Sequence, residues 1–215
     1  MHIRVYGVQP DEMPAYEAAK EKYGFTFEFE KTPLSEETAD QVKGCEGLII
    51  LTNCHVTEPV AKTLAANGVK YIACRSAGSD HVDYAAVTKY GMKCAHVPAY
   101  APEAISEHTV MLALEVLRHA KLCARKVEEG DFTMAGLKGR QLGNLTAGVL
   151  GTGRIGRVTM SILNGFGTKV LGWDPFPNDA AAKLCTYVEK DELLKTADII
   201  FLHCPLTDDS YHLIN

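Results

Sequence analysis

The fold of this chain is decided by one stretch, Leu145-Thr146-Ala147-Gly148-Val149-Leu150-Gly151-Thr152-Gly153-Arg154-Ile155-Gly156-Arg157-Val158. A short apolar, β-prone run leads into three glycines with the spacing G-x-G-x-x-G, and a helix-compatible run follows over 157–164. This order predicts the strand, tight turn and helix of a dinucleotide-binding βαβ unit.

Each glycine of this loop has a separate physical role in such a unit. Gly151 allows the tight turn, Gly153 lets the backbone approach a pyrophosphate, and Gly156 lets the helix pack closely on the strand. The pyrophosphate would lie at the N-terminus of the helix, where unpaired N–H groups and the positive end of the dipole favour an anion.

An acidic residue strengthens the cofactor hypothesis. A second strand over 169–173 delivers Asp174 at its carboxyl end, roughly 20 residues beyond the glycines, as the ribose-binding acid requires. A carboxylate there accepts hydrogen bonds from a 2′-hydroxyl and repels a 2′-phosphate, so the sequence predicts NAD rather than NADP. A glycine loop alone is also typical of an ordinary turn, but the strand, the helix and the acid all agree with a cofactor site.

Composition excludes several classes of protein. The 215 residues are 47% hydrophobic and 23% charged, which is typical of a globular chain with one large or two modest cores. No apolar run approaches about 18 residues and no secretion leader is evident, so no membrane partner is expected. The net charge of −5 comes without a basic stripe and argues against nucleic acid as a partner. Seven cysteines without a C-x-x-C pair favour reduced thiols in the cytoplasm.

The first half alternates predicted strands with predicted helices. The expected strands cover 3–8, 25–30, 47–51, 69–74 and 92–97; the expected helices cover 11–23, a segment that Thr57 can cap, and 83–90. This alternation predicts a doubly wound parallel α/β sheet, which binds ligands beyond the carboxyl ends of its strands. The loops after Leu51, Cys74 and Val97 are therefore the candidate binding loops.

A domain boundary is predicted at Tyr100, where Pro98 and Pro102 force extended backbone. We expect a substrate-binding domain over 1–99 and a nucleotide-binding domain over 100–215. A long helix is predicted over 103–127, and its middle, 110–117, is apolar nearly all round, so it needs cover on both sides. The prediction is a homodimer through the 103–127 region; burial of the helix between the two domains is the alternative.

The second domain is expected to be incomplete. After the glycine loop the sequence predicts a short helix over 191–195 and a strand over 198–204, which is only the first half of a doubly wound domain. The strand over 145–150 would then have an unpaired apolar edge, which folded proteins avoid. We therefore expect the chain to be the N-terminal portion of a longer protein and to be inactive by itself.

Five ordered motifs resemble the NAD-dependent D-2-hydroxyacid dehydrogenases, and the resemblance is closest to the D-lactate dehydrogenase branch. The motifs are Arg75-Ser76-Ala77-Gly78-Ser79-Asp80-His81-Val82-Asp83, Val97-Pro98-Ala99-Tyr100-Ala101-Pro102, Ala104-Ile105-Ser106-Glu107-His108-Thr109, Gly151-Thr152-Gly153-Arg154-Ile155-Gly156 and Leu202-His203-Cys204-Pro205-Leu206. The resemblance implies an α/β protein with parallel sheets, in which a flavodoxin-like substrate domain precedes a partial Rossmann NAD-binding domain. It implies reversible hydride transfer between NADH and pyruvate or a related 2-keto acid, giving a D-2-hydroxy acid, in a cleft that closes to exclude water.

The resemblance also assigns roles to individual residues. The substrate carboxylate would be held by backbone N–H groups of Ser76, Ala77 and Gly78, which otherwise form a simple strand-to-helix turn, and Tyr100 would reach the substrate pocket unless it only packs at the hinge. The implied cofactor contacts are, from the pyrophosphate to the adenosine, Gly151, Gly153, Arg154, Ile155, Gly156, Asp174, Cys204, Pro205 and, more weakly, Ser210.

Catalytic residues are not expected in this segment. In the family a histidine, a glutamate and an arginine act on the substrate, and the resemblance places all three beyond Asn215. His203 is interpreted as structural, and no histidine spacing indicates a metal. Leu51 stands where some D-lactate enzymes carry a tyrosine, so the identity of the 2-keto acid stays open. The alternatives are an NAD-sensing co-repressor on the same fold and, among enzymes, a phosphoglycerate or formate dehydrogenase.

Overall fold

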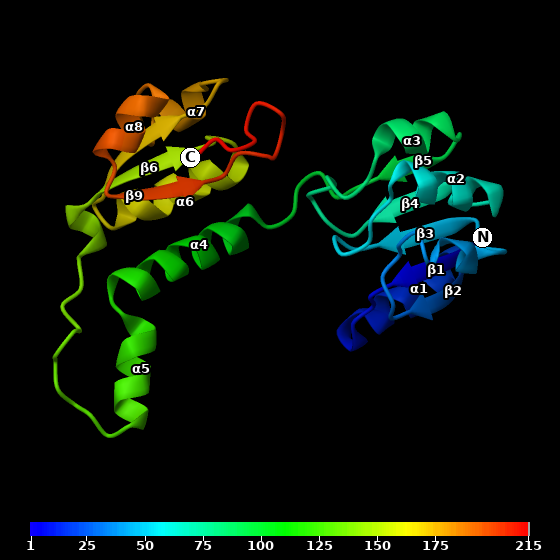
Figure 1. Cartoon of the computed structure of the whole chain (residues 1–215), viewed down its shortest axis with the longest axis horizontal. Coiled ribbons are helices and arrows are strands. Elements are labelled where there is room, and N and C mark those ends of the chain that lie inside the picture. Colours follow the sequence, from blue (N-terminus) through cyan, green and yellow to red (C-terminus); the bar gives the residue numbers. More distant parts are fainter. Residues whose placement is uncertain (215) are drawn as a thin grey trace. The chain divides into compact units, whose positions relative to one another are not determined.

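The computed structural model describes residues 1–214 and divides into two compact units after Tyr100, one residue beyond the boundary expected from the prolines. The backbone at the division is unusual, because Ala101 has a φ of 30° although it carries a side chain. Pro102 follows at the first position of a helix, where its missing N–H costs nothing. Each unit contains its own core, and Figure 1 shows a separate sheet in each.

The first unit alternates strands with helices along the chain. Its strands are β1 (His2–Tyr6), β2 (Thr26–Glu30), β3 (Gly47–Ile50), β4 (Tyr71–Cys74) and β5 (Lys93–Ala95). Its helices are α1 (Met13–Tyr23), α2 (Glu58–Ala66) and α3 (Tyr84–Lys89), together with the 3-10 helices η1 (Pro10–Glu12) and η2 (Ala39–Val42). The expected elements are all present, with ends that differ by a few residues.

The five strands of the first unit are parallel and lie in the order β2-β1-β3-β4-β5, with Ile3 opposite Gly47 and Gly47 opposite Tyr71. This is the flavodoxin-like order, and it confirms the expected parallel α/β fold. Strand β3 is buried almost throughout because helices cover both faces of the sheet. The loops after β3, β4 and β5 leave the sheet at one edge.

Two helix starts show which local predictions succeed. Asp83 caps α3, since its side chain accepts a hydrogen bond of 2.9 Å from the backbone N–H of Ala86. Thr57 occupies the N-cap position of α2, but the expected capping bond is absent. Its hydroxyl donates to the carboxylate of Glu36 at 3.1 Å, and no backbone N–H of α2 donates to it.

The second unit contains a four-stranded parallel sheet. Its strands are β6 (Thr146–Leu150), β7 (Lys169–Trp173), β8 (Thr186–Tyr187) and β9 (Ile199–Leu202). Its helices are α4 (Pro102–Leu117), α5 (Ala120–Glu128), α6 (Arg154–Gly165), α7 (Asp179–Ala182) and α8 (Lys190–Thr196), with the 3-10 helix η3 (Leu142–Asn144). The short elements β8 and α7 were not expected from the sequence.

The strand order of this sheet is β8-β7-β6-β9, which corrects one expectation. Strand β6 has no open edge, because Ala147 to Leu150 pair with β7 on one side and with β9 on the other. The order corresponds to strands 3-2-1-4 of a dinucleotide-binding sheet, so the chain includes the first strand of the second half as well. Among the described residues the edge strands of this sheet are β8 and β9.

Alternation along β6 creates two core layers. Ala147 and Val149 belong to the cluster formed with α4 and α6, whereas Leu150 packs with Leu171 and with Leu193 of α8. Leu193 places α8 on one face of the sheet, whereas Ala181 of α7 belongs to the cluster on the other face, with α4 and α6. The sheet is therefore covered on both faces and presents its strand ends as the site for a ligand.

The predicted single helix over 103–127 is wrong. The helix ends at Leu117, and His119 adopts a left-handed conformation with φ of 52°, which an α-helix cannot contain. Helix α4 packs on α6, but α5 has no fully buried residue. The segment over 103–127 therefore forms two helices, α4 and α5. Part of its apolar surface stays exposed, since Val116 on α4 is 73% exposed.

The described part of the chain contains no helix that is both long and apolar enough to cross a membrane. All seven cysteines are present as free thiols.

Candidate functional site

The glycine loop connects β6 to α6 in a shape that requires glycine. Gly151 has a φ of 92°, and a Cβ atom there would lie 2.6 Å from the backbone nitrogen of Cys204. A Cβ atom on Gly156 would collide with the carbonyl oxygen of Gly151. The turn, the first turn of α6 and the end of β9 therefore contact one another through backbone atoms.

Gly153 differs from these two glycines because no atom lies within 4 Å of the position that its Cβ would take. Nothing within the protein therefore demands a glycine at this position. The open space lies at the N-terminus of α6, where Gly153 is the N-cap and has no side chain to cap the helix. A ligand group that approaches the backbone here would meet no side chain, so the loop fits a pyrophosphate.

The first turn of α6 supplies the electrostatic attraction for such a group. The first intrahelical bond is donated by the N–H of Arg157 to the carbonyl of Gly153, so the amides of Arg154, Ile155 and Gly156 precede the bonded part of the helix. Unpaired amides and the helix dipole favour an anion. The Arg154 side chain is exposed, and the carbonyl of Ile155 accepts a hydrogen bond of 3.0 Å from Ser106.

Asp174 lies at the carboxyl end of β7 and is tied to the glycine loop. Its Oδ2 accepts hydrogen bonds from the backbone N–H of Thr152 at 2.6 Å and from the hydroxyl of Thr152 at 3.1 Å. Its Oδ1 accepts a hydrogen bond of 2.9 Å from the backbone N–H of Phe176. The predicted ribose acid is therefore held against the loop that would bind the phosphates.

One cavity of about 620 Å³ brings the predicted cofactor residues together. Six residues singled out from the sequence line this cofactor cavity, namely Gly151, Gly153, Asp174, Cys204, Pro205 and Ser210. Arg154, Ile155 and Gly156, in the first turn of α6, are not among its lining residues.

The cofactor cavity also has lining residues that the sequence did not assign to the cofactor, among them His203, which it assigned a structural role. They are Trp173, Pro175, Phe176, Lys190, His203, Thr207, Asp209 and Leu213. They come from the ends of β7 and β9 and from the start of α8, so the carboxyl ends of the parallel strands were the available signal. The wall is mainly apolar near Trp173, Phe176 and Leu213, which suits an adenine ring.

Ser210 shapes the wall of this cavity. Its hydroxyl donates to the carbonyl of Pro205 at 2.6 Å and accepts from the backbone N–H of Thr207 at 2.7 Å. The single hydroxyl proton is therefore directed at the protein. Ser210 fixes the loop that follows β9, and with it the position of Pro205.

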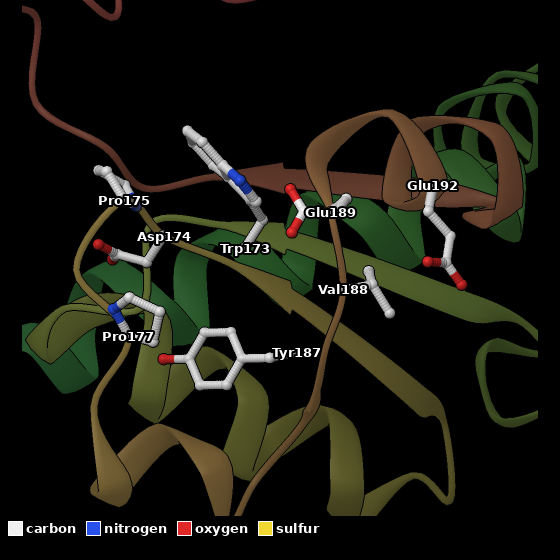
Figure 2. A pocket seen from close by; sticks show the side chains of 8 residues that line it. All are labelled: Trp173, Asp174, Pro175, Pro177, Tyr187, Val188, Glu189 and Glu192. Atoms are coloured by element: carbon white, nitrogen blue, oxygen red, sulfur yellow. The ribbon is translucent and has the colours of Figure 1, made fainter.

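A second cavity of about 570 Å³ shares Trp173, Asp174 and Pro175 with the first. Figure 2 shows its lining, in which Asp174 and Tyr187 lie at the ends of the neighbouring strands β7 and β8. Glu189 and Glu192 also line it. These acids give the region around Asp174 a negative potential, which would repel a 2′-phosphate.

His203 follows β9 and is held inside the unit. Its Nε2 lies 3.0 Å from the hydroxyl of Thr159 on α6. Burial lowers the pKa of His203, because the charged imidazolium would be desolvated. These contacts agree with the interpretation of His203 as a structural residue.

The candidate substrate loop follows β4 in the first unit. Within residues 1–214, the backbone N–H groups of Ser76, Ala77 and Gly78 have no acceptor in hydrogen-bond reach. The hydroxyl of Ser76 donates to the carbonyl of Gly78 at 2.7 Å, and a ring nitrogen of His96 lies 2.9 Å from the carbonyl of Ala77. The carbonyls are thus occupied while the amides stay available to an anion.

Arg75 holds this loop from the other side. Its guanidinium donates to the carbonyls of Tyr6 and Gly7 at 3.0 and 3.1 Å and forms an ion pair with Glu12. The carboxyl end of β1 and the start of the loop are therefore joined. Hydrogen bonds from Arg75 and from the backbone of Gln9 lower the pKa of Glu12 against the opposing effect of burial.

Tyr100 lies near this loop along the chain. The backbone N–H of Val97 donates to the carbonyl of Ser76 at 3.1 Å, and Tyr100 comes three residues later with a side chain that is 70% exposed. No hydrogen bond from its hydroxyl occurs among the described residues. A role for Tyr100 in a substrate pocket stays a prediction.

One cluster of possible metal ligands occurs elsewhere in the first unit. Ligand atoms of His2, Glu28 and Cys45 lie within 4.8 Å of one another. The guanidinium of Arg4 lies 2.5 Å from the Glu28 carboxylate. A cation would have to compete with Arg4 for that carboxylate, so the cluster is not assigned a metal.

The chain is similar in sequence to a known family and to curated proteins. Residues 110–215 match the family described as "D-isomer specific 2-hydroxyacid dehydrogenase, NAD binding domain". An aromatic 2-oxoacid reductase of Clostridium sporogenes is 41% identical over 215 residues, which are 100% of this chain and 65% of that protein. The chain thus spans about two thirds of the length of its curated relatives.

Two solved structures of D-lactate dehydrogenases are also similar to this chain. The structure of D-lactate dehydrogenase from Escherichia coli without ligand is 39% identical and has a TM-score of 0.87, covering 100% of this chain and 68% of that one. The D-lactate dehydrogenase from Aquifex aeolicus, which was solved with NAD and lactic acid, is 32% identical with a TM-score of 0.88. This match covers 99% of the present chain and 63% of the Aquifex chain.

Proposed function

The chain belongs to the family of D-isomer specific 2-hydroxyacid dehydrogenases, and from this premise we propose that the protein catalyses NAD-dependent reduction of a 2-keto acid. The product is the D-2-hydroxy acid, and the reaction is reversible. The observation that carries the proposal is the cofactor cavity, in which the glycine loop and Asp174 face one space. The relatives named for lactate and for aromatic 2-oxoacids support pyruvate or a related 2-keto acid as substrate.

The second unit binds the cofactor in this proposal. The amides at the start of α6 hold the pyrophosphate beside Gly153, and the carboxylate of Asp174 accepts a hydrogen bond from the adenosine ribose. The adenosine lies beside Cys204 and Pro205, in the part of the cavity with apolar walls. When bound, NADH supplies the hydride that reduces the keto group.

The first unit binds the substrate. The free amides of Ser76, Ala77 and Gly78 donate hydrogen bonds to the carboxylate of the 2-keto acid, and Arg75 keeps the loop in place. We assign binding and positioning to these residues, and proton transfer to none of them. The arrangement requires a small anionic substrate, because three adjacent amides fit one carboxylate.

The test is turnover by the full-length protein with NADH and a panel of pyruvate, 2-ketoisocaproate and phenylpyruvate. We expect NADH oxidation with at least one of them and a product of D configuration. The ratio of kcat/KM values for pyruvate and phenylpyruvate then assigns the substrate class. A protein that binds NADH but reduces none of these acids would instead be the NAD-sensing binding protein on the same fold.

We also propose a homodimer through the region of α4 and α5. Apolar side chains on these helices and on the following loop are exposed in the single chain, including Val116 at 73%, Phe132 at 79% and Met134 at 76%. Isolated exposed apolar residues are common, but several in one region indicate an interface. Helix α5, without a fully buried residue of its own, gains cover from a second copy.

A further inference from the structure

Thr152 is the residue between the first two glycines of the loop, and it is fully buried. Its hydroxyl oxygen lies 3.1 Å from Asp174 Oδ2, 2.7 Å from the Tyr187 hydroxyl and 3.2 Å from Asn178 Nδ2. Three groups, from the residue after β7, from β8 and from the segment before α7, therefore meet at this one oxygen of the glycine loop.

The direction of these hydrogen bonds follows from the chemistry of the groups. A carboxylate only accepts, so the single proton of the Thr152 hydroxyl is donated to Asp174. The lone pairs of the Thr152 oxygen must then accept, which directs the proton of Tyr187 toward Thr152. The Tyr187 oxygen in turn accepts from the backbone N–H of Asn178 at 3.2 Å. A chain of donors thus runs from Asn178 through Tyr187 and Thr152 to Asp174.

This chain determines which acceptor sites of Asp174 stay available. A carboxylate has about four lone-pair sites, two on each oxygen. Oδ2 already accepts two bonds from Thr152, while Oδ1 accepts one bond from Phe176. The site that remains by this count is on Oδ1, so a ligand hydroxyl is received by one oxygen in one orientation.

We propose that Tyr187, acting through Thr152, is a positioning residue that holds the Asp174 carboxylate in the orientation that receives the ribose of NAD. The inference rests on the proposed cofactor role of this unit. Figure 2 shows the Tyr187 ring beside Asp174 at the edge of the second cavity. The phenol fixes a carboxylate on the neighbouring strand without reaching the cofactor itself.

The test is a double-mutant cycle measured as NADH affinity by calorimetric titration of the protein. Tyr187→Phe removes only the hydroxyl, and Asp174→Asn removes the acceptor charge. We expect Tyr187→Phe to weaken NADH binding about threefold to fivefold in the wild-type background, as for the loss of one hydrogen bond. The same change should have no effect when Asp174 is already Asn, because the two residues act as one unit.

A second pair of variants tests the hydroxyl of Thr152, which links Tyr187 to Asp174. Thr152→Val keeps the shape of the side chain and loses the hydroxyl, so NADH binding should weaken about tenfold, as expected for a hydrogen bond to a charged group. Thr152→Ser keeps the hydroxyl and should bind NADH nearly as the wild type does. Tyr23→Phe, at an exposed tyrosine in the other unit, is the matched control. If Tyr187→Phe prevents folding, the NADH affinities of Thr152→Val and Thr152→Ser test the same inference.

The outcomes separate this inference from the proposed function. A wild-type protein that does not bind NADH contradicts the cofactor role, and the inference falls with it. If the wild type binds NADH, Tyr187→Phe can lower the affinity equally in both backgrounds, or in neither. Either result contradicts the positioning role of Tyr187 and leaves the proposed function standing. Equal affinities of Thr152→Val and Thr152→Ser also contradict the positioning role. A merely structural role would lower the unfolding temperature without the dependence on Asp174.

Discussion

A Cβ atom on Gly156 would overlap the carbonyl oxygen of Gly151, so helix α6 touches the glycine loop backbone to backbone. The contact brings the N-terminus of the helix to the end of β6. Because the end of β9 also contacts Gly151, three elements of the second unit depend on this one point.

Gly156→Ala should therefore destabilise the second unit. The added methyl group has no space and meets backbone atoms, so we expect a loss of about 3 kcal/mol in the free energy of unfolding, the upper end of the usual cost of overpacking. Gly165→Ala, in the same helix but with no atom within 4 Å, is the control and should be neutral or slightly stabilising. Chemical denaturation measures both; equal stabilities would show that the contact is not tight.

Arg75→Lys should weaken substrate binding without changing cofactor binding. Lysine keeps the positive charge beside Glu12 but cannot donate to the carbonyls of Tyr6 and Gly7 together. In the full-length protein we expect the KM for the 2-keto acid to rise about tenfold while the affinity for NADH is unchanged. A rise in both constants would mean that Arg75 supports more than the substrate loop.

The pKa of His203 gives the stability a pH dependence. Burial lowers this pKa in the folded protein, whereas the unfolded chain takes up a proton near pH 6.5. The unfolded state binds more protons below that pH, so stability falls as pH drops from about 7 toward the lower folded pKa. His203→Gln should reduce this dependence, and His81, whose pKa is also lowered by burial, should retain part of it. Identical slopes in the variant and the wild type would contradict the prediction.

Val116→Glu should convert a dimer into a monomer. The side chain is exposed in the single chain, so the folded subunit should keep its unfolding temperature while a buried charge opposes association. Light scattering after gel filtration measures the mass. Tyr23→Glu, at another exposed apolar position, should remain dimeric. A wild-type protein of monomer mass would exclude the interface.

The sequence predicts the elements around the glycine loop well because several signals coincide there. The strand over 169–173 has the same bounds in the structure, whereas α6 starts at Arg154 rather than 157. Strand β8 has only two residues, Thr186–Tyr187, which is too short for a periodic pattern. The helix break at His119 carries neither glycine nor proline, so no local signal marks it.

Sheet topology was the main limit of sequence reasoning. Nothing in the apolar pattern of 145–150 shows that β9 pairs with its far side, and the expected open edge was therefore wrong. For the site, the spacing identified Gly153 and Asp174, which line one cavity. It could not identify Tyr187 or Asn178, because their link to Thr152 exists only after β8 joins the sheet. Cofactor contact by Gly153 and Asp174 stays a prediction.

The most direct test of the account is the affinity of Gly153→Ala for NADH. A Cβ atom at this position meets no protein atom and the backbone is unstrained, so the variant should fold with the stability of the wild type. The account predicts that the methyl group enters the space of the pyrophosphate and weakens binding at least tenfold, which corresponds to about 1.4 kcal/mol. A folded Gly153→Ala protein that binds NADH as tightly as the wild type would contradict the account.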